Sequence, residues 1–195
     1  MIKRNKQNGF TLVEILAVMM VFGIIGGISA GILITTLRTS NKSNIITIVK
    51  QNGDYAISQI TKTIRNSYTL KYPTLPCGSE LSPTVSSYIQ VVDDTGNLST
   101  ISCVGSNPPP AIPTIPPNTI TLQQGSGSQT SLLDATKVQT QDCSFTCTQA
   151  TTNDYPVIEI AFSLLQKSTS NFVEQIASSS AINFSTSVVF RNYQH

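Results

Sequence analysis

Hydrophobic residues collect first in one uninterrupted segment near the N-terminus. From Ile15 to Leu37 no charged side chain occurs over 23 consecutive positions. A helix of about 20 apolar residues is long enough to cross the hydrocarbon core of a bilayer. Hydrophobicity then falls sharply over residues 38–52. The pattern therefore predicts a membrane-spanning helix over residues 10–37 and a domain outside the membrane over residues 38–195.

Downstream of this segment the apolar residues change to a helical periodicity. They lie three or four positions apart and form one stripe of an amphipathic helix. The stripe consists of Ile45, Ile48 or Val49, Ala56, Ile57, Ile60, Ile64 and Tyr68. We expect this helix to end near Ser67, with Lys62 and Arg65 on its solvent-exposed face and the stripe covering a sheet. Gly53 and Asp54 predict a bend or a short break within it.

The rest of the chain alternates between apolar and polar residues, as β-strands do. The runs cover residues 86–104, 119–123, 137–149, 155–166 and 182–192. The first run contains two strands around Asp93–Asn97, a strong hairpin signal. In the fourth run, Ile158, Ile160 and Phe162 point inward and the residues between them outward, or the reverse. The sequence predicts an α+β fold, with a long N-terminal helix packed on an antiparallel β-sheet domain.

Two segments between these runs carry turn and loop signals. Residues 107–118 contain six prolines in twelve positions, which favours an extended, exposed loop. Such a segment is also the kind of ligand that proline-recognising grooves bind. Residues 125–128, Gly-Ser-Gly-Ser, predict a flexible turn.

Charge is distributed unevenly along the chain. Lys3, Arg4 and Lys6 precede Gly9, whereas nine basic and nine acidic residues follow from Arg38 onward. The outer domain is therefore neutral, although the whole chain has a formal net charge of +2. A neutral domain lacks the basic surface that nucleic-acid binding requires, so we expect no nucleic-acid partner. The hydrophobic content of 39% is too high for a disordered chain.

The four cysteines all lie in the predicted outer domain, at Cys77, Cys103, Cys143 and Cys147. An even number outside the membrane favours two disulfides, for which three connectivities exist. Because Cys143 and Cys147 are close in sequence, we favour a local Cys143–Cys147 bridge and a Cys77–Cys103 bridge. The alternative is four free cysteines packed as small apolar side chains. The spacing does not fit a zinc site, and the only histidine is His195.

Three interpretations compete for the N-terminus. A secretory signal peptide has an apolar region of about 7–15 residues, shorter than the one here. A signal anchor fits the length, and the basic leader would hold the N-terminus in the cytoplasm. Neither accounts for Glu14, which lies one residue before the uncharged segment. An ionisable side chain at such a place is costly and usually functional.

Residues 9–14, Gly-Phe-Thr-Leu-Val-Glu, follow the basic leader and closely resemble the processing site of type IV prepilins and pseudopilins. In that family a membrane-embedded prepilin peptidase cuts after the glycine and methylates the new N-terminal residue. The resemblance implies that residues 1–9 are a leader, that cleavage follows Gly9 and that Phe10 is the methylated mature N-terminus. It also implies a pilin-like fold, whose apolar helix is a membrane anchor before assembly and filament core afterwards.

The resemblance further implies a role for Glu14 in assembly. Cleavage creates a cationic amine on Phe10, and opposite charges in an apolar environment attract strongly. If Glu14 of one subunit pairs with the amine of its neighbour, each new subunit is held in one axial register. The alternative is that Glu14 extends to the lipid headgroups of an ordinary anchor.

Glycines interrupt the apolar helix at Gly23, Gly26, Gly27 and Gly31. The Gly27–Gly31 spacing is typical of a close helix-packing face. Glycines also weaken a helix by about 1 kcal/mol each, and in the pilin family the middle of this helix is often loosened in the filament. The sequence leaves packing and loosening as equal alternatives.

The order of the remaining segments resembles one branch of the family. Residues 58–67, 131–145 and 184–192 follow the layout of PilW-like minor pilins and J-type pseudopilins, including an arginine–asparagine ending of the last strand. The family resemblance is specific over about 30 N-terminal residues and diffuse beyond them. Neither the cysteines nor the proline-rich loop is assigned by it.

The sequence contains no recognisable catalytic or cofactor motif. His195 lies at the chain end and lacks a nucleophile partner, and the adjacent Asp93 and Asp94 point apart on a turn. Some pseudopilins bind calcium, but these two aspartates fall short of a loop with six or more oxygen ligands. We therefore expect a solvated turn, no metal, no cofactor and no enzymatic activity.

Three functions are consistent with the sequence. The first is a minor pilin or pseudopilin that helps to initiate or cap a type IV pilus or related pseudopilus, for motility, adhesion, DNA uptake or protein secretion. The second is a tip-located adhesin or DNA-capture module, and the third a plain signal-anchored surface protein. For the first, the partners are other pilin subunits, the prepilin peptidase and membrane lipid before assembly. The expected location is the cytoplasmic membrane, N-terminus in and outer domain out, and then the filament.

Overall fold

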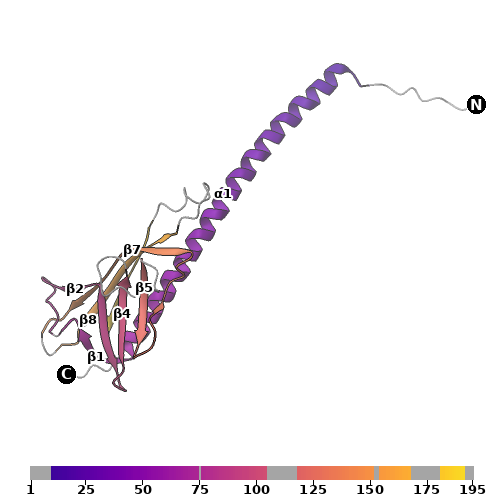
Figure 1. The fold of residues 1–195 in the computed structure, drawn as a ribbon. Coiled ribbons are helices and arrows are strands. Elements are labelled where there is room, and N and C mark those ends of the chain that lie inside the picture. Colours follow the sequence, from indigo (N-terminus) through magenta and orange to yellow (C-terminus); the bar gives the residue numbers. More distant parts are fainter. Residues whose placement is uncertain (1–9, 75, 105–117, 152–153, 168–180, 192–195) are drawn as a thin grey trace, which may run out of the picture. The chain divides into compact units, whose positions relative to one another are not determined.

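The structure, a computed structural model, describes residues 10–74, 76–104, 118–151, 154–167 and 181–191. These residues divide into two compact units, one ending at Ser43 and one beginning at Asn44. Helix α1 begins in the first unit and ends in the second (Figure 1). The second unit contains all the strands.

Helix α1 spans Leu12–Arg65 without interruption, so the break expected near Gly53 is wrong. Gly53 lies in a close contact instead: a Cβ atom at residue 53 would overlap the ring of Phe184. Glycine serves here to bring the helix backbone against an aromatic side chain, not to interrupt the helix. The Asn52 side-chain carbonyl, one residue earlier, accepts a hydrogen bond of 2.9 Å from the Asp134 backbone.

The predicted apolar stripe of the helix is confirmed in the second unit, except that Tyr68 lies in strand β1 (Ser67–Tyr72) and not in the helix. The residues of α1 that are buried there are Ile45, Val49, Gly53, Ala56, Ile60 and Ile64. They recur every three or four positions and belong to one hydrophobic core with the inward side chains of the strands. Lys62 and Arg65 are exposed, as the sequence predicts.

Two antiparallel sheets form the rest of the second unit. The first sheet has the order β1-β3-β4-β5-β6 and the second the order β2-β7-β8-β9. The first contains β1 (Ser67–Tyr72), β3 (Tyr88–Asp93), β4 (Leu98–Val104), β5 (Thr119–Gln124) and β6 (Thr130–Ser131). The second contains β2 (Thr84–Ser86), β7 (Val138–Thr148), β8 (Val157–Gln166) and β9 (Ile182–Val189). The chain thus changes sheet at Ser87.

The strand predictions hold in most places. The hairpin of β3 and β4 pairs Val92 with Leu98 across the predicted turn. In β8, Ile158, Ile160 and Phe162 are buried, which resolves the inward and outward faces. The proline-rich residues 107–117 lie outside the described residues, so the loop prediction stays untested.

All four cysteines are joined in two disulfides, but the favoured pairing is wrong. Cys77 pairs with Cys147 and Cys103 with Cys143, with Cα–Cα distances of 5.5 and 5.8 Å. Cys143 and Cys147 both lie on β7, where four residues of extended chain span about 13 Å. That separation is far beyond the reach of a disulfide. The Cys103–Cys143 bridge connects the two sheets, because β4 and β7 belong to different ones.

Candidate functional site

The beginning of α1 carries the residues that the sequence singles out. Phe10 precedes the helix and is 78% exposed, and Glu14 lies in the first helical turn. The backbone N–H of Glu14 donates to the Thr11 hydroxyl oxygen at 3.3 Å and to the Thr11 carbonyl oxygen at 3.1 Å. Thr11 is therefore the N-cap of the helix. This role of Thr11 could have been predicted, because a threonine three residues before a glutamate is the signature of a capping box.

The Glu14 carboxylate has two properties that matter for an intermolecular contact. It is exposed, and within the described residues no cationic side chain pairs with it. Its place in the first turn also puts it near the positive end of the helix dipole, which stabilises a negative charge. The carboxylate is thus held on a regular helix and is open to a partner from outside the chain. Gly9 lies outside the described residues, so its predicted role stays a prediction.

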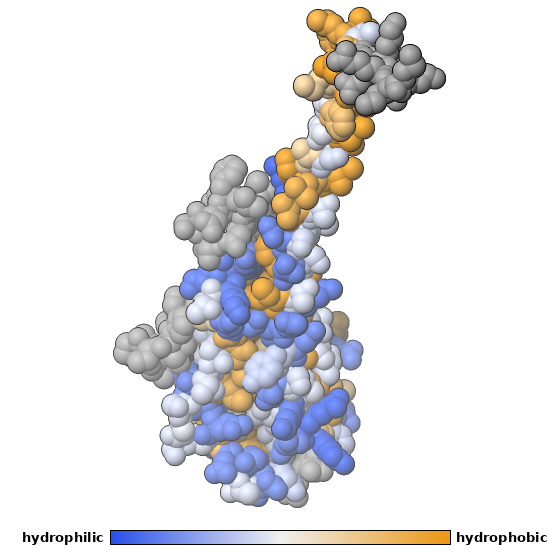
Figure 2. Space-filling view, turned by 90° about the vertical axis from the view of Figure 1, so that its right-hand side faces the viewer, coloured by the Kyte–Doolittle hydropathy of each residue, from blue (hydrophilic) through white to orange (hydrophobic). Residues whose placement is uncertain are grey.

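The large hydrophobic side chains in the apolar part of α1 are exposed, and Figure 2 shows this on the face in view. This helix is long and apolar enough to cross a membrane. Its few hydroxyl groups are satisfied within the helix: Ser29 donates to the Ile25 carbonyl and Thr36 to the Ile32 carbonyl, both at 2.8 Å. An apolar environment requires such internal satisfaction of polar groups. The segment is therefore suited to burial in lipid or among other helices.

The four glycines of this segment have no packing partner among the residues that the structure describes. A Cβ atom at Gly23, Gly26, Gly27 or Gly31 would meet no other atom within 4 Å. The helix also continues through all four. Loosening in the filament and packing against another helix both stay predictions.

The acidic turn between β3 and β4 is stabilised by its own hydrogen bonds. One Asp93 carboxylate oxygen accepts bonds from the Thr95 N–H, the Thr95 hydroxyl and the Asn97 N–H, at 3.0, 2.7 and 2.8 Å. These donors, with the Thr95 hydroxyl first, lower the pKa of Asp93 below its ordinary value. Among the described residues no group of three or more histidine, cysteine or acidic residues is placed to hold a metal ion. The carboxylate of Asp93 thus has a structural role in this turn.

Comparison with known proteins supports the interpretation of the N-terminus. Residues 4–30 match the family model described as the prokaryotic N-terminal methylation motif. This motif is the signature of type IV prepilins and pseudopilins. The match includes Gly9, Phe10 and Glu14. No curated protein and no solved structure matched the chain.

Proposed function

We propose that this chain, which carries the type IV prepilin and pseudopilin signature, is a minor subunit that helps to initiate or cap a pilus or pseudopilus. The observation that carries the proposal is the placement of Glu14. It is an exposed carboxylate in the first turn of a helix whose following segment is apolar on all sides. A helix of this kind serves both as a membrane anchor and as the core of a helical filament.

Processing comes first in the proposed mechanism. A prepilin peptidase removes residues 1–9 and methylates Phe10, which leaves a mature chain of 186 of the 195 residues. The basic leader holds the N-terminus on the cytoplasmic side until cleavage. Phe10 and Thr11 precede the helix, so the new amine begins next to the helix start and not within its hydrogen-bonded turns.

Assembly then depends on the new amine and Glu14. An uncompensated charge among apolar helices costs several kcal/mol, so a subunit is stable in the filament only where the two groups pair. Thr11 caps the helix through its own hydroxyl, so the carboxylate of Glu14 is not needed for that bond. It stays available to the amine of a neighbouring subunit.

The domain from Asn44 onward supports a minor over a major role. One disulfide, Cys77–Cys147, attaches the connection between β1 and β2 to strand β7. The other, Cys103–Cys143, joins the two sheets. Such a cross-linked domain is suited to one specialised position in a filament. Partners in this proposal are other pilin subunits and the peptidase, and the protein is membrane-anchored before it is assembled.

Fractionation of host cells tests this function. We expect the mature chain in the sheared filament or pseudopilus fraction, at far lower copy number than the main subunit. In cells without the prepilin peptidase, the full-length precursor should stay in the membrane fraction. A mature chain found only in the membrane, never with filament subunits, would contradict the proposal.

A further inference from the structure

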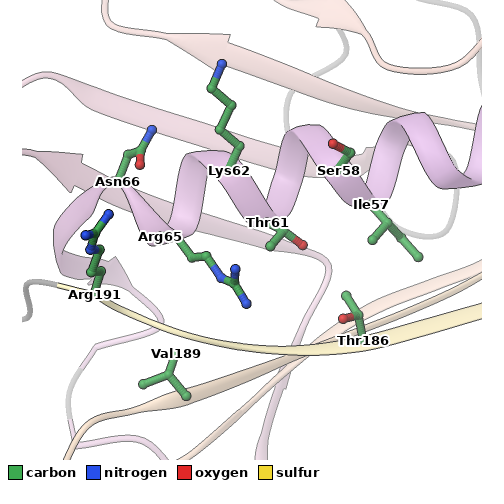
Figure 3. Close-up of a pocket in the computed structure, with 9 residues that line it drawn as sticks. All are labelled: Ile57, Ser58, Thr61, Lys62, Arg65, Asn66, Thr186, Val189 and Arg191. Atoms are coloured by element: carbon green, nitrogen blue, oxygen red, sulfur yellow. The ribbon is translucent and has the colours of Figure 1, made fainter.

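A groove of about 790 Å³ lies between the last turns of α1 and strand β9 (Figure 3). Both sides of the groove belong to the unit that begins at Asn44. The helix contributes Thr61, Lys62 and Arg65, and the strand and the residues after it contribute Thr186, Val189 and Arg191. Neither the methylation motif nor the proposed assembly mechanism uses this groove.

The groove concentrates positive charge on an outer domain whose net charge is zero. Of the described residues that line it, three are basic and none is acidic. Within the described residues, Lys62, Arg65 and Arg191 form no ion pair; the single pair found there joins Lys137 and Asp134. Figure 3 shows the Arg65 side chain extending toward β9 and Lys62 pointing to the other side of the helix. Two guanidinium groups, from two different elements, thus border the space.

A buried hydroxyl in the groove lacks a partner. The Oγ1 atom of Thr61 is buried and makes no hydrogen bond. Threonine in a helix can donate to the carbonyl four residues earlier, as Thr63 does to Gln59 at 2.9 Å. Thr61 does not, and its side chain points toward β9 (Figure 3). The groove therefore borders a buried polar atom whose hydrogen-bonding capacity is unused.

Strand β9 offers backbone groups on the same side of the molecule. It pairs with β8 and is the last strand of its sheet, so in the described residues no strand pairs with its second edge. Thr186 is inward-facing and Val189 is exposed, yet both line the groove. Successive side chains of a strand point to opposite faces of its sheet. Thr186 and Val189 can both line the groove because the groove extends around the edge of β9. An open edge beside a helix suits an extended peptide that adds as a further strand.

We propose that this groove binds an extended acidic segment of a partner subunit, which lies beside β9 with its carboxylates held by Arg65 and Arg191. Arginine favours this role because its planar guanidinium group binds a carboxylate through two parallel hydrogen bonds. The inference rests on the proposed function in one respect, that the partner is another subunit of the filament. The competing explanation is that the basic residues only stabilise the negative end of the α1 dipole.

Site-specific photo-cross-linking in host membranes tests the inference. The photoreactive amino acid p-benzoylphenylalanine replaces Val189 in the full-length chain, and mass spectrometry identifies the peptide that becomes attached. We expect an adduct with an acidic segment of another subunit that carries the methylation motif. The double variant Arg65→Gln, Arg191→Gln should reduce its yield at least fivefold. The matched double variant Lys50→Gln, Lys71→Gln removes two exposed charges away from the groove and should leave the yield unchanged.

Several results would overturn the inference. These are no adduct, an adduct only with lipid or nucleic acid, an adduct with a neutral or basic segment, or an equal yield from both double variants. The thermal unfolding of the Arg65→Gln, Arg191→Gln chain shows whether it is folded, so a structural effect is recognised. Co-purification with other subunits is measured in the same cells. A chain that co-purifies but forms no adduct contradicts the groove alone, whereas one that never co-purifies contradicts the proposed function.

Discussion

Glu14 is the residue on which the proposed assembly depends. In the structure its backbone takes part in helix capping, whereas its carboxylate is free for the proposed charge pairing. The capping bond at the start of α1 is made by the Thr11 hydroxyl and the Glu14 backbone N–H. The carboxylate itself is exposed and has no cation beside it in the described part of the chain. Capping and charge pairing can therefore be tested by different substitutions.

Replacing Glu14 by alanine should leave membrane insertion intact, because loss of a charge makes the helix more apolar. Cleavage after Gly9 should also persist. Co-purification with partner subunits should fall by a factor of a few hundred, since an unpaired buried charge costs about 3–5 kcal/mol. Glu14→Gln should be nearly as defective, because the amide keeps the shape but not the charge.

Thr11→Ala is the matched control for this prediction. It removes the N-cap, which costs about 1 kcal/mol of helix stability, but keeps the carboxylate. We expect it to associate nearly as well as the native chain. Equal association of the Glu14→Ala and native chains would show that the charge pair does not operate in this subunit.

Gly53 gives a second prediction at this scale. Overpacking of a core typically costs about 1–3 kcal/mol, and the Cβ atom of Gly53→Ala would overlap the Phe184 ring. Alanine favours a helix by about 1 kcal/mol over glycine, so the net loss should be about 1 kcal/mol. Denaturant unfolding of the domain measures it.

The control is Gly31→Ala, at a position surrounded by open space in the same helix. It should leave the unfolding free energy of the domain unchanged. In a Phe184→Leu background, Gly53→Ala should cost less than in the native chain. Additive effects of the two substitutions would show that the ring does not set the requirement for glycine.

At the scale of elements, the sequence pattern within one segment predicted helices and strands well. Contacts between distant segments could not be predicted from it. The apolar stripe of α1 and the alternation in β8 follow from local periodicity, so both were predictable. The close fit that requires glycine at residue 53 involves Phe184, more than a hundred residues later. Assignment of β2 and β3 to different sheets likewise depends on pairing with distant strands. No local signal contains this information.

The disulfide connectivity is the clearest case of this limit. Proximity in sequence favoured Cys143–Cys147, but an extended strand separates these two residues. Non-reducing peptide mapping should find Cys77 linked to Cys147 and Cys103 linked to Cys143. A Cys143–Cys147 peptide, or four thiols open to alkylation in the native protein, would contradict the arrangement of the strands.

Removing the bridge between the sheets should be costly. Cys103→Ser with Cys143→Ser opens a connection over a sequence separation of 40 residues, and loop-closure entropy predicts a loss of about 4 kcal/mol. Thermal unfolding under non-reducing conditions measures this loss. An unchanged unfolding temperature would show that the two sheets do not depend on the bridge.

At the scale of the whole molecule, the chain combines a short basic N-terminal segment, an apolar helical segment and a neutral, cross-linked domain. The type IV prepilin and pseudopilin signature was predictable, because the residues that carry it lie together within residues 4–30. The groove at β9 was not predictable, since its two arginines lie far apart in sequence and are brought together only by the packing of α1 and β9. The domain thus contains a candidate partner-binding surface, the groove at β9, that lies outside the motif.

Mass spectrometry of the intact protein from its native host tests the central claim most directly. If this chain is processed as a prepilin-type subunit, its N-terminus is Phe10 carrying one methyl group, and residues 1–9 are missing. A chain with Gly9→Leu serves as the control and should keep its leader and stay in the membrane. An intact Met1, or a terminus well beyond Phe10, in the native chain would contradict the account.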